Sequence, residues 1–155
     1  MVEIDRTDRR ILAALQLDAD QSLEALGARI GLSRNACWRR IRRLEEAGVI
    51  RGRVALCDPA ALGIAQTVIV TVRTDRHDAD WLERFTTAVR EIPEILGAYR
   101  TAGETDYVLR ARVADVADYD RLYRRLIAKV PVRDISASFV MEELKETSAL
   151  PVELL

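Results

Sequence analysis

The chain has 155 residues, 24 basic and 25 acidic side chains, a net charge of −1 and an apolar fraction of 49%. This composition is typical of a folded protein with a hydrophobic core and excludes an intrinsically disordered chain. No apolar run approaches the roughly 20 residues of a membrane-spanning helix, and the acidic start lacks the pattern of a secretory signal. With two cysteines and one histidine, we expect no disulfide framework, no metal or other cofactor, and a reduced cytoplasmic protein.

The first third of the chain predicts three short helices around a small core. Asp5 and Asp8 place negative charge in the first turn of a helix that continues with apolar residues at helical spacing. A second helix is predicted from the N-cap Ser22 to Ile30, and Gly31 then allows a tight turn.

The third predicted helix, residues 34–47, is amphipathic and basic. Cys37, Ile41 and Leu44 recur at i, i+4 and i+7 and therefore share a buried face. Residues 34–53 contain seven arginines and two glutamates, whereas residues 57–155 are net acidic. A concentrated basic segment indicates a local anionic partner. The alternative is a solvated arginine-rich face that reflects the preference of the chain for arginine over lysine.

The spacing of glycines before this helix matches a helix-turn-helix. A small residue is needed at Gly27 because the two helices approach closely there, and Gly31 supplies the turn conformation. The second helix of such a motif enters the major groove of DNA with its exposed face. We therefore predict DNA contacts from this helix and from the basic segment after it, namely from Ser33, Arg34, Asn35, Trp38, Arg39, Arg42, Arg51 and Arg53.

The rest of the chain changes to a strand-and-helix pattern. Residues 50–56 favour a short strand or wing, and residues 57–63 read as a hinge between domains 1–56 and 64–155. The second domain has the order β-α-β-β-α-β, with strands at 64–73, 95–101, 107–113 and 134–144 and helices at 80–92 and 116–130. This order predicts an α+β domain in which two helices cover one face of a four-stranded antiparallel sheet. We expect Val68, Val70, Tyr107 and Leu109 to belong to apolar sets on both faces, and a second copy to cover the open face.

These motifs resemble the Lrp/AsnC (feast/famine) transcription regulators. The resemblance is carried by the run from Leu32 to Gly52, by Asp58-Pro59 and Leu62-Gly63, by Gly103-Glu104-x-Asp106-Tyr107, and by the tail from Val140 to Pro151. It implies an N-terminal winged helix-turn-helix domain, a C-terminal ferredoxin-like (ACT-like) domain that senses a ligand, and a homo-oligomer built from dimers. The chain departs from the family pattern at Gly27, where alanine is commoner, and at Ala137, which is flanked by serines where threonine is frequent.

The turn between the two middle strands is the predicted effector site. In the resembling family its Gly-x-x-Asp loop lies at an interface between dimers and helps to hold small ligands, often amino acids. Backbone amides can bind the carboxylate of an amino acid, and acidic side chains can accept from its ammonium group. The simpler interpretation is a hairpin whose acids face water. The predicted effector-binding residues are Tyr99, Thr101, Gly103, Glu104, Asp106 and Tyr107.

Two other classes of function remain as alternatives. Siroheme decarboxylase subunits resemble this family, but their chemistry depends on basic residues that include histidine, and His77 reads as a loop residue. We therefore expect no catalytic residues. A small-molecule-binding module that no longer contacts DNA is disfavoured by the arginine-rich helix face. The sequence predicts a sequence-specific DNA-binding transcription regulator whose oligomeric state or DNA binding is modulated by a small molecule, for which we expect an amino acid.

Overall fold

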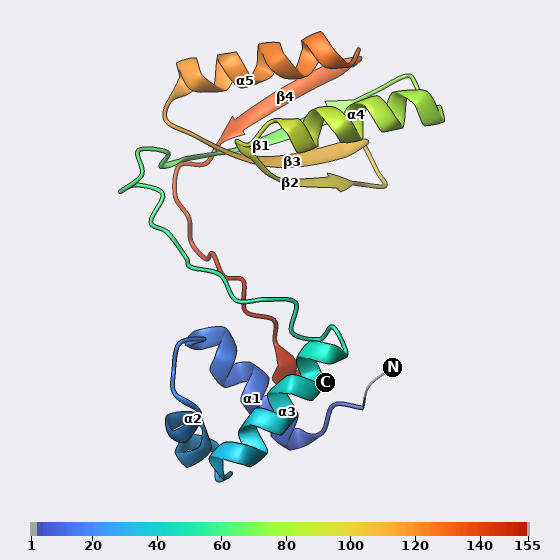
Figure 1. The fold of residues 1–155 in the computed structure, drawn as a ribbon. Helices are drawn as coiled ribbons and strands as arrows, with labels where there is room; N and C mark the ends of the chain where they lie inside the picture. Colours follow the sequence, from blue (N-terminus) through green and yellow to red (C-terminus); the bar gives the residue numbers. More distant parts are fainter. Residues whose placement is uncertain (1–2, 155) are drawn as a thin grey trace. The chain divides into compact units, whose positions relative to one another are not determined.

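The computed structural model describes residues 3–154, so residues 1, 2 and 155 of the expected domains lie outside it. The chain forms two compact units (Figure 1). The helical unit combines the residues up to Ala55 with the C-terminal segment from Lys145 onward, and the sheet unit spans Leu56–Leu144. The sequence assigns residues 145–155 to the second domain. The structure differs, because this segment packs against the helices of the first.

The helical unit contains α1 (Arg6–Leu17), α2 (Leu23–Ile30), α3 (Arg34–Glu46) and a final 3-10 turn, η1 (Val152–Leu154). Each α-helix begins at a side chain that accepts a bond from a backbone N–H of the first turn. This confirms the predicted cap Ser22, whereas Asp5, which the sequence places in the first turn, is the cap that precedes it. The three N-caps are Asp5, Ser22 and Ser33.

The C-terminal segment completes the core of the helical unit. Val152 is only 8% exposed and belongs to the same apolar cluster as Ile11 and Leu26. The side chain of Gln16 in α1 makes two bonds to the backbone of Leu150, donating to its oxygen at 3.1 Å and accepting from its nitrogen at 2.6 Å. Residues far apart in sequence are therefore joined within one folded unit.

The turn between α2 and α3 depends on two glycines. Gly31 has a φ of 74°, a left-handed conformation that favours glycine. A Cβ atom on Gly27 would lie 2.5 Å from the carbonyl oxygen of Leu32. The backbone therefore approaches Gly27 closely, as expected, but from the turn at Leu32; the Sγ of Cys37 in α3 would lie 3.6 Å from the Cβ, an ordinary contact.

Residues 51–58 form no strand, so the strand predicted for residues 50–56 is wrong. Val54 and Leu56 are exposed along this segment. A strand requires a neighbour that pairs with its backbone, and no other segment among residues 3–154 takes that place.

The sheet unit contains β1 (Gln66–Arg73), α4 (Ala79–Glu91), β2 (Ile95–Arg100), β3 (Tyr107–Val113), α5 (Val116–Lys129) and β4 (Asp134–Phe139). The strands are antiparallel in the order β2-β3-β1-β4, and both helices lie on the same face of the sheet (Figure 1). The predicted architecture is confirmed. The last strand ends at Phe139 instead of continuing to 144, and Met141 beyond it is exposed.

The strand register corrects one expectation about the sheet. Val68, Val70, Tyr107 and Leu109 are all buried in the core beneath the helices, and none of them faces the open side. The residues between them alternate to the other face of the sheet. This helix-free face carries Thr67, Ile69, Thr71, Val108, Arg110, Arg112, Ser136 and Ser138.

Candidate nucleic-acid interface and ligand sites

The side chains of α3 divide into a buried and an exposed face, as predicted. Cys37, Ile41 and Leu44 are buried. Trp38 is 53% exposed, and the guanidinium of Arg42 lies 6.0 Å from its ring centroid. The exposed residues at the start of the helix and along its outer face are Ser33, Arg34, Asn35, Trp38, Arg39 and Arg42. An aromatic side chain with a cation beside its ring therefore faces solvent on α3.

The predicted DNA-contacting arginines differ in what they bind. Arg39 and Arg51 form no ion pair among the residues that the structure describes, so their charges are available to an external anion. Three others form exposed pairs, which contribute little to stability and which phosphate groups can replace. These pairs are Arg34–Glu24 at 2.7 Å, Arg42–Glu46 at 3.4 Å and Arg53–Glu45 at 2.9 Å.

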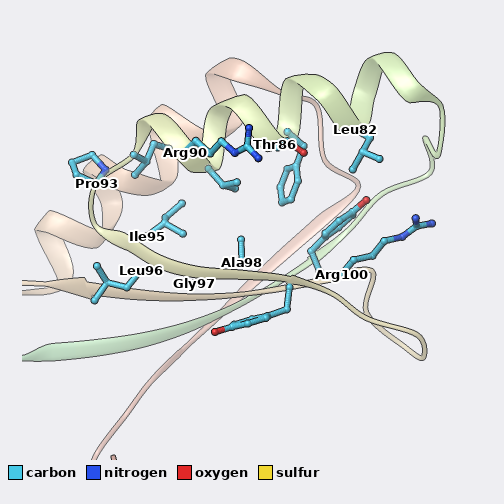
Figure 2. A pocket seen from close by; sticks show the side chains of 14 residues that line it. Leu82, Thr86, Arg90, Pro93, Ile95, Leu96, Gly97, Ala98 and Arg100 are labelled. Carbon is cyan, nitrogen blue, oxygen red and sulfur yellow. The ribbon is translucent and has the colours of Figure 1, made fainter. Parts of the chain in front are cut away.

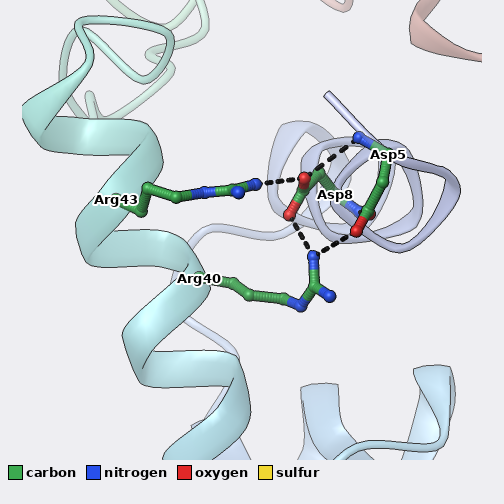
Figure 3. Close-up of polar contacts among 4 residues, drawn as sticks. All are labelled: Asp5, Asp8, Arg40 and Arg43. Carbon is green, nitrogen blue, oxygen red and sulfur yellow. Dashed lines mark hydrogen bonds and ion pairs between the residues drawn. The ribbon is translucent and has the colours of Figure 1, made fainter. Parts of the chain in front are cut away.

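Two arginines of the basic segment hold α3 against α1 (Figure 3). Asp8 is fully buried, and its carboxylate accepts bonds from Arg43 and, at 2.8 Å, from Arg40. Arg40 also bonds Asp5 at 2.7 Å. The backbone N–H of Asp8, followed by Arg40, lowers the pKa of Asp5 to about 2. This cluster of four residues fixes how α3 presents its outer face.

The predicted effector turn uses several of its polar groups internally. The hydroxyl of Thr101 donates to the backbone oxygen of Thr105 at 2.6 Å. The carboxylate of Asp106 accepts from the backbone N–H of Thr74 at 2.8 Å and so ties the turn to the end of β1. Gly103, with a φ of 143°, and the exposed Glu104 form the tip.

The two predicted effector tyrosines lie in different places. Tyr107 is buried, and its ring packs against Phe85 and Trp81 with centroid distances of 4.5 and 5.5 Å. Tyr99 is exposed and pairs with Val108, which places it on the helix-free face. Its ring covers Gly97, where a Cβ atom would lie 2.8 Å from the tyrosine hydroxyl. The structure does not bring the six predicted residues together around one cavity.

A groove of about 460 Å³ runs between α4 and β2 (Figure 2). Its walls include Leu82 and Arg90 from the helix and Ile95 and Arg100 from the strand. Tyr99 and Tyr107 also line it, but the other predicted effector residues do not. Sequence reasoning missed this groove because it depends on how α4 lies over the edge of the sheet.

The remaining polar residues that the sequence singled out are exposed. His77 lies in the loop before α4, between Arg76 and Asp78, which form an ion pair at 3.0 Å. Ser136 and Ser138 face outward from β4. Within residues 3–154, no group of three His, Cys, Asp or Glu side chains is arranged to hold a metal ion, and no helix is long and apolar enough to cross a membrane.

Comparison with known proteins agrees with both units. Residues 4–51 match a winged helix-turn-helix DNA-binding domain, and residues 67–150 match the Lrp/AsnC ligand binding domain. The DNA-binding transcriptional activator DecR of Escherichia coli is 45% identical, over 97% of this chain and 99% of its own.

Two solved structures are similar over almost their whole length. An AsnC family transcriptional regulator from Agrobacterium tumefaciens has a TM-score of 0.94 and 47% identity, over 97% of this chain and 99% of its own. A transcriptional regulator of Neisseria meningitidis in complex with L-methionine has a TM-score of 0.93 and 34% identity, over 99% of this chain and all of its own. The chain described here therefore belongs to the Lrp/AsnC family of transcription regulators.

Proposed function

We propose that this regulator reads DNA with α3 in the major groove. The observation that carries the proposal is the exposed face of α3, where Asn35, Trp38 and Arg39 stand clear of the core. Asparagine and arginine recognise the edges of adenine and guanine, and the Ser33-capped helix start can bind a phosphate. Arg51 and Arg53, which follow α3, supply contacts to the DNA backbone.

Binding as a homodimer would place two α3 helices in successive major grooves, roughly 34 Å apart, on a near-palindromic site. We propose that the helix-free faces of two sheets pack together. Ile69 and Val108 are only partly buried on that face, and Tyr99 is exposed beside them. Light scattering should give a dimer or a larger assembly at micromolar concentration, and a monomer would contradict the two-groove arrangement.

An amino acid is the proposed effector. The match to a ligand binding domain and the L-methionine complex of the Neisseria regulator support this class of ligand. At the turn of residues 101–106, backbone amides around Gly103 can donate to the carboxylate of an amino acid, and the exposed carboxylate of Glu104 can accept from its ammonium group. A thermal-shift screen of the common amino acids should reveal stabilisation, which Glu104→Gln should weaken if the turn holds the ligand.

We also propose that the chain is a cytoplasmic regulator and not an enzyme. His77 is exposed beside an ion pair, an environment that favours a surface role over histidine-dependent chemistry on a tetrapyrrole. Absorbance of the purified protein separates these alternatives, because a bound tetrapyrrole absorbs visible light.

The DNA proposal is tested by selecting binding sites from random DNA and measuring band shifts. Arg39→Ala and Asn35→Ala should relax sequence preference, whereas Arg51→Ala should weaken binding to all DNA and reduce the log–log salt slope by about one. Arg124→Ala, on α5 of the sheet unit, is the matched control and should change neither. Unaltered band shifts for an Arg34→Ala/Arg39→Ala double variant would show that α3 does not enter the groove.

A further inference from the structure

Arg34 is the first residue of α3, at the end of the helix that the proposed docking places nearest to the bases. Its Nε lies 2.7 Å from Oε1 of Glu24, and both side chains are exposed. Glu24 belongs to α2, so this ion pair joins the two helices of the motif. Among residues 3–154, the two terminal nitrogens of Arg34 form no hydrogen bond and no ion pair.

The paired arginines farther along this surface use a terminal nitrogen instead. Arg42 pairs with Glu46, and Arg53 pairs with Glu45, each through Nη2. A guanine presents two acceptors, N7 and O6, and an arginine reads it by donating from two N–H groups at once. A carboxylate at Nε leaves both terminal groups of a guanidinium for that contact, whereas a carboxylate at Nη2 occupies one of them. Arg34 is therefore the paired arginine best arranged to read a base.

The turn between α2 and α3 fixes the backbone positions of the two partners. The backbone N–H groups of Gly31 and Leu32 both donate to the carbonyl oxygen of Gly27 at 2.9 Å. Glu24 lies in the first turn of α2, about one turn before Gly27, and Arg34 follows the N-cap of α3. The separation of Glu24 and Arg34 is therefore set by the fold and not by a flexible loop.

The ion pair also changes what Arg34 attracts. An arginine and a carboxylate together carry no net charge, and the carboxylate repels a phosphate that approaches the same guanidinium. The edge of a guanine is uncharged and meets no such repulsion. A side chain that is already oriented also loses less rotamer freedom when it binds. The pair therefore favours a base over a phosphate as the partner of Arg34.

We propose that Glu24 is a positioning residue for sequence recognition. Its carboxylate orients Arg34 toward a guanine of the binding site and keeps this arginine from the phosphates, and the pair persists in the specific complex. The inference rests on the proposed entry of α3 into the major groove. It assigns to an acidic residue of α2, which itself contacts no base, a part in choosing the DNA sequence.

The experiment selects binding sites from random DNA with the full chain and then measures band shifts on the selected site with each base pair replaced in turn. Arg34→Ala should lose the preference for guanine at one base pair by about five- to hundredfold. Glu24→Gln should lose about two- to fivefold at the same base pair, the range of an exposed ion pair. Asp20→Asn removes the same charge from an exposed residue before α2. It is the matched control and should leave the preference unchanged.

Salt dependence gives a second readout that a purely structural role of Glu24 would not move. Without the carboxylate, Arg34 is free to bind a phosphate. Glu24→Gln should therefore strengthen binding to random DNA and steepen the log–log salt slope by up to about one. Asp20→Asn frees no arginine and should not steepen it.

The double variant Glu24→Gln/Arg34→Ala shows whether the glutamate acts through the arginine. It should have the same base preference as Arg34→Ala alone. An equal loss from Glu24→Gln with and without Arg34 would overturn the inference, and so would a base preference in Glu24→Gln identical to that of the wild type. If Arg34→Ala keeps its guanine preference while Arg39→Ala relaxes the site elsewhere, this inference alone fails. Unaltered band shifts in the Arg34→Ala/Arg39→Ala double variant would overturn the docking of α3 as well.

Discussion

The carboxylate of Asp8 is fully buried and forms ion pairs with the guanidinium groups of Arg40 and Arg43. Its two arginines are partly exposed, so they can regain water when the carboxylate is removed. The cost of losing Asp8 is therefore mainly the loss of its charge-assisted bonds and of its side chain in the capping box with Asp5.

We expect Asp8→Ala to lower the free energy of unfolding by about 2–4 kcal/mol. Urea unfolding followed by circular dichroism measures this loss. Asp120→Ala removes the exposed Asp120–Arg124 pair of α5 and should leave the midpoint almost unchanged. Equal effects of the two substitutions would show that the Asp8 cluster is no more important than a surface ion pair.

Asp5 gives the helical unit a dependence on pH. Its pKa is lowered to about 2 in the folded chain from the ordinary value of 3.8, so it stabilises the fold above pH 4. This contribution disappears as the pH falls through about 2, because the folded state then gains the proton. Asp5→Asn retains an N-cap but not the charge. Acid titrations should therefore show a smaller loss of stability for Asp5→Asn than for the wild type between pH 4 and 2.

The sequence indicates Asp5 and Asp8 as first-turn acids. Asp8 is one, whereas Asp5 is the N-cap that precedes the helix. The sequence could not indicate that Asp8 binds Arg40 and Arg43, because those bonds depend on how α1 lies against α3. Similarly, the arginines of residues 34–53 look equivalent by composition. Only the folded chain separates Arg39, which is free of ion pairs among the described residues, from Arg43, which is held by Asp8.

Among the secondary-structure elements, the α2–α3 turn contains a position, Gly27, where helix propensity favours alanine but packing favours glycine. Alanine favours a helix over glycine by about 1 kcal/mol, and the family resemblance suggests that alanine suits position 27. In this chain, however, a Cβ there would lie 2.5 Å from the backbone oxygen of Leu32. The backbone of the turn would have to move to accept it.

Gly27→Ala is therefore expected to destabilise the helical unit by about 1–3 kcal/mol despite its better helix propensity. Thermal unfolding followed by circular dichroism gives the sign. Gly52→Ala is the matched control, because a Cβ at Gly52 meets nothing within 4 Å. A stabilised Gly27→Ala variant would mean that the turn relaxes at little cost.

The sheet unit shows which structural features can be predicted from sequence periodicity and which cannot. The β-α-β-β-α-β order follows from periodicity, and every predicted strand of that order forms, although β4 ends earlier. Which residues face the helices depends on register, which alternation alone leaves open by one residue. The pairing of Val70 with Leu109 and Ala137 places all three on the helix side, so the open face is more polar than the sequence suggests.

For the whole molecule, the chain crosses between the two units twice. It leaves the helical unit after Ala55 and returns at Lys145. The sequence pattern of residues 145–155 contains no periodicity that assigns it to either unit, and a domain limit drawn along the sequence cannot describe a unit made of two segments. Only the tertiary structure shows that Val152 packs beside α1.

Val152→Ala should lower the stability of the helical unit by about 1–2 kcal/mol, because two buried methyl groups are lost. Leu154→Ala, two residues later and 84% exposed, is expected to have no measurable effect. Hydrogen exchange of the α1 amides reports the change within the correct unit. If Val152→Ala leaves α1 exchange as slow as in the wild type, the C-terminal segment is not part of that core.

The distribution of the two tryptophans has a practical consequence for optical work. Trp38 is largely exposed on α3, whereas Trp81 is buried in α4 and stacks on Phe85 with a centroid distance of 4.9 Å. Indole emission shifts to longer wavelength in water, so the two units carry spectrally separable intrinsic fluorophores. With tryptophan excited selectively, a Trp81→Phe chain would then emit only from the exposed face of α3, and a Trp38→Phe chain only from the core of the sheet unit.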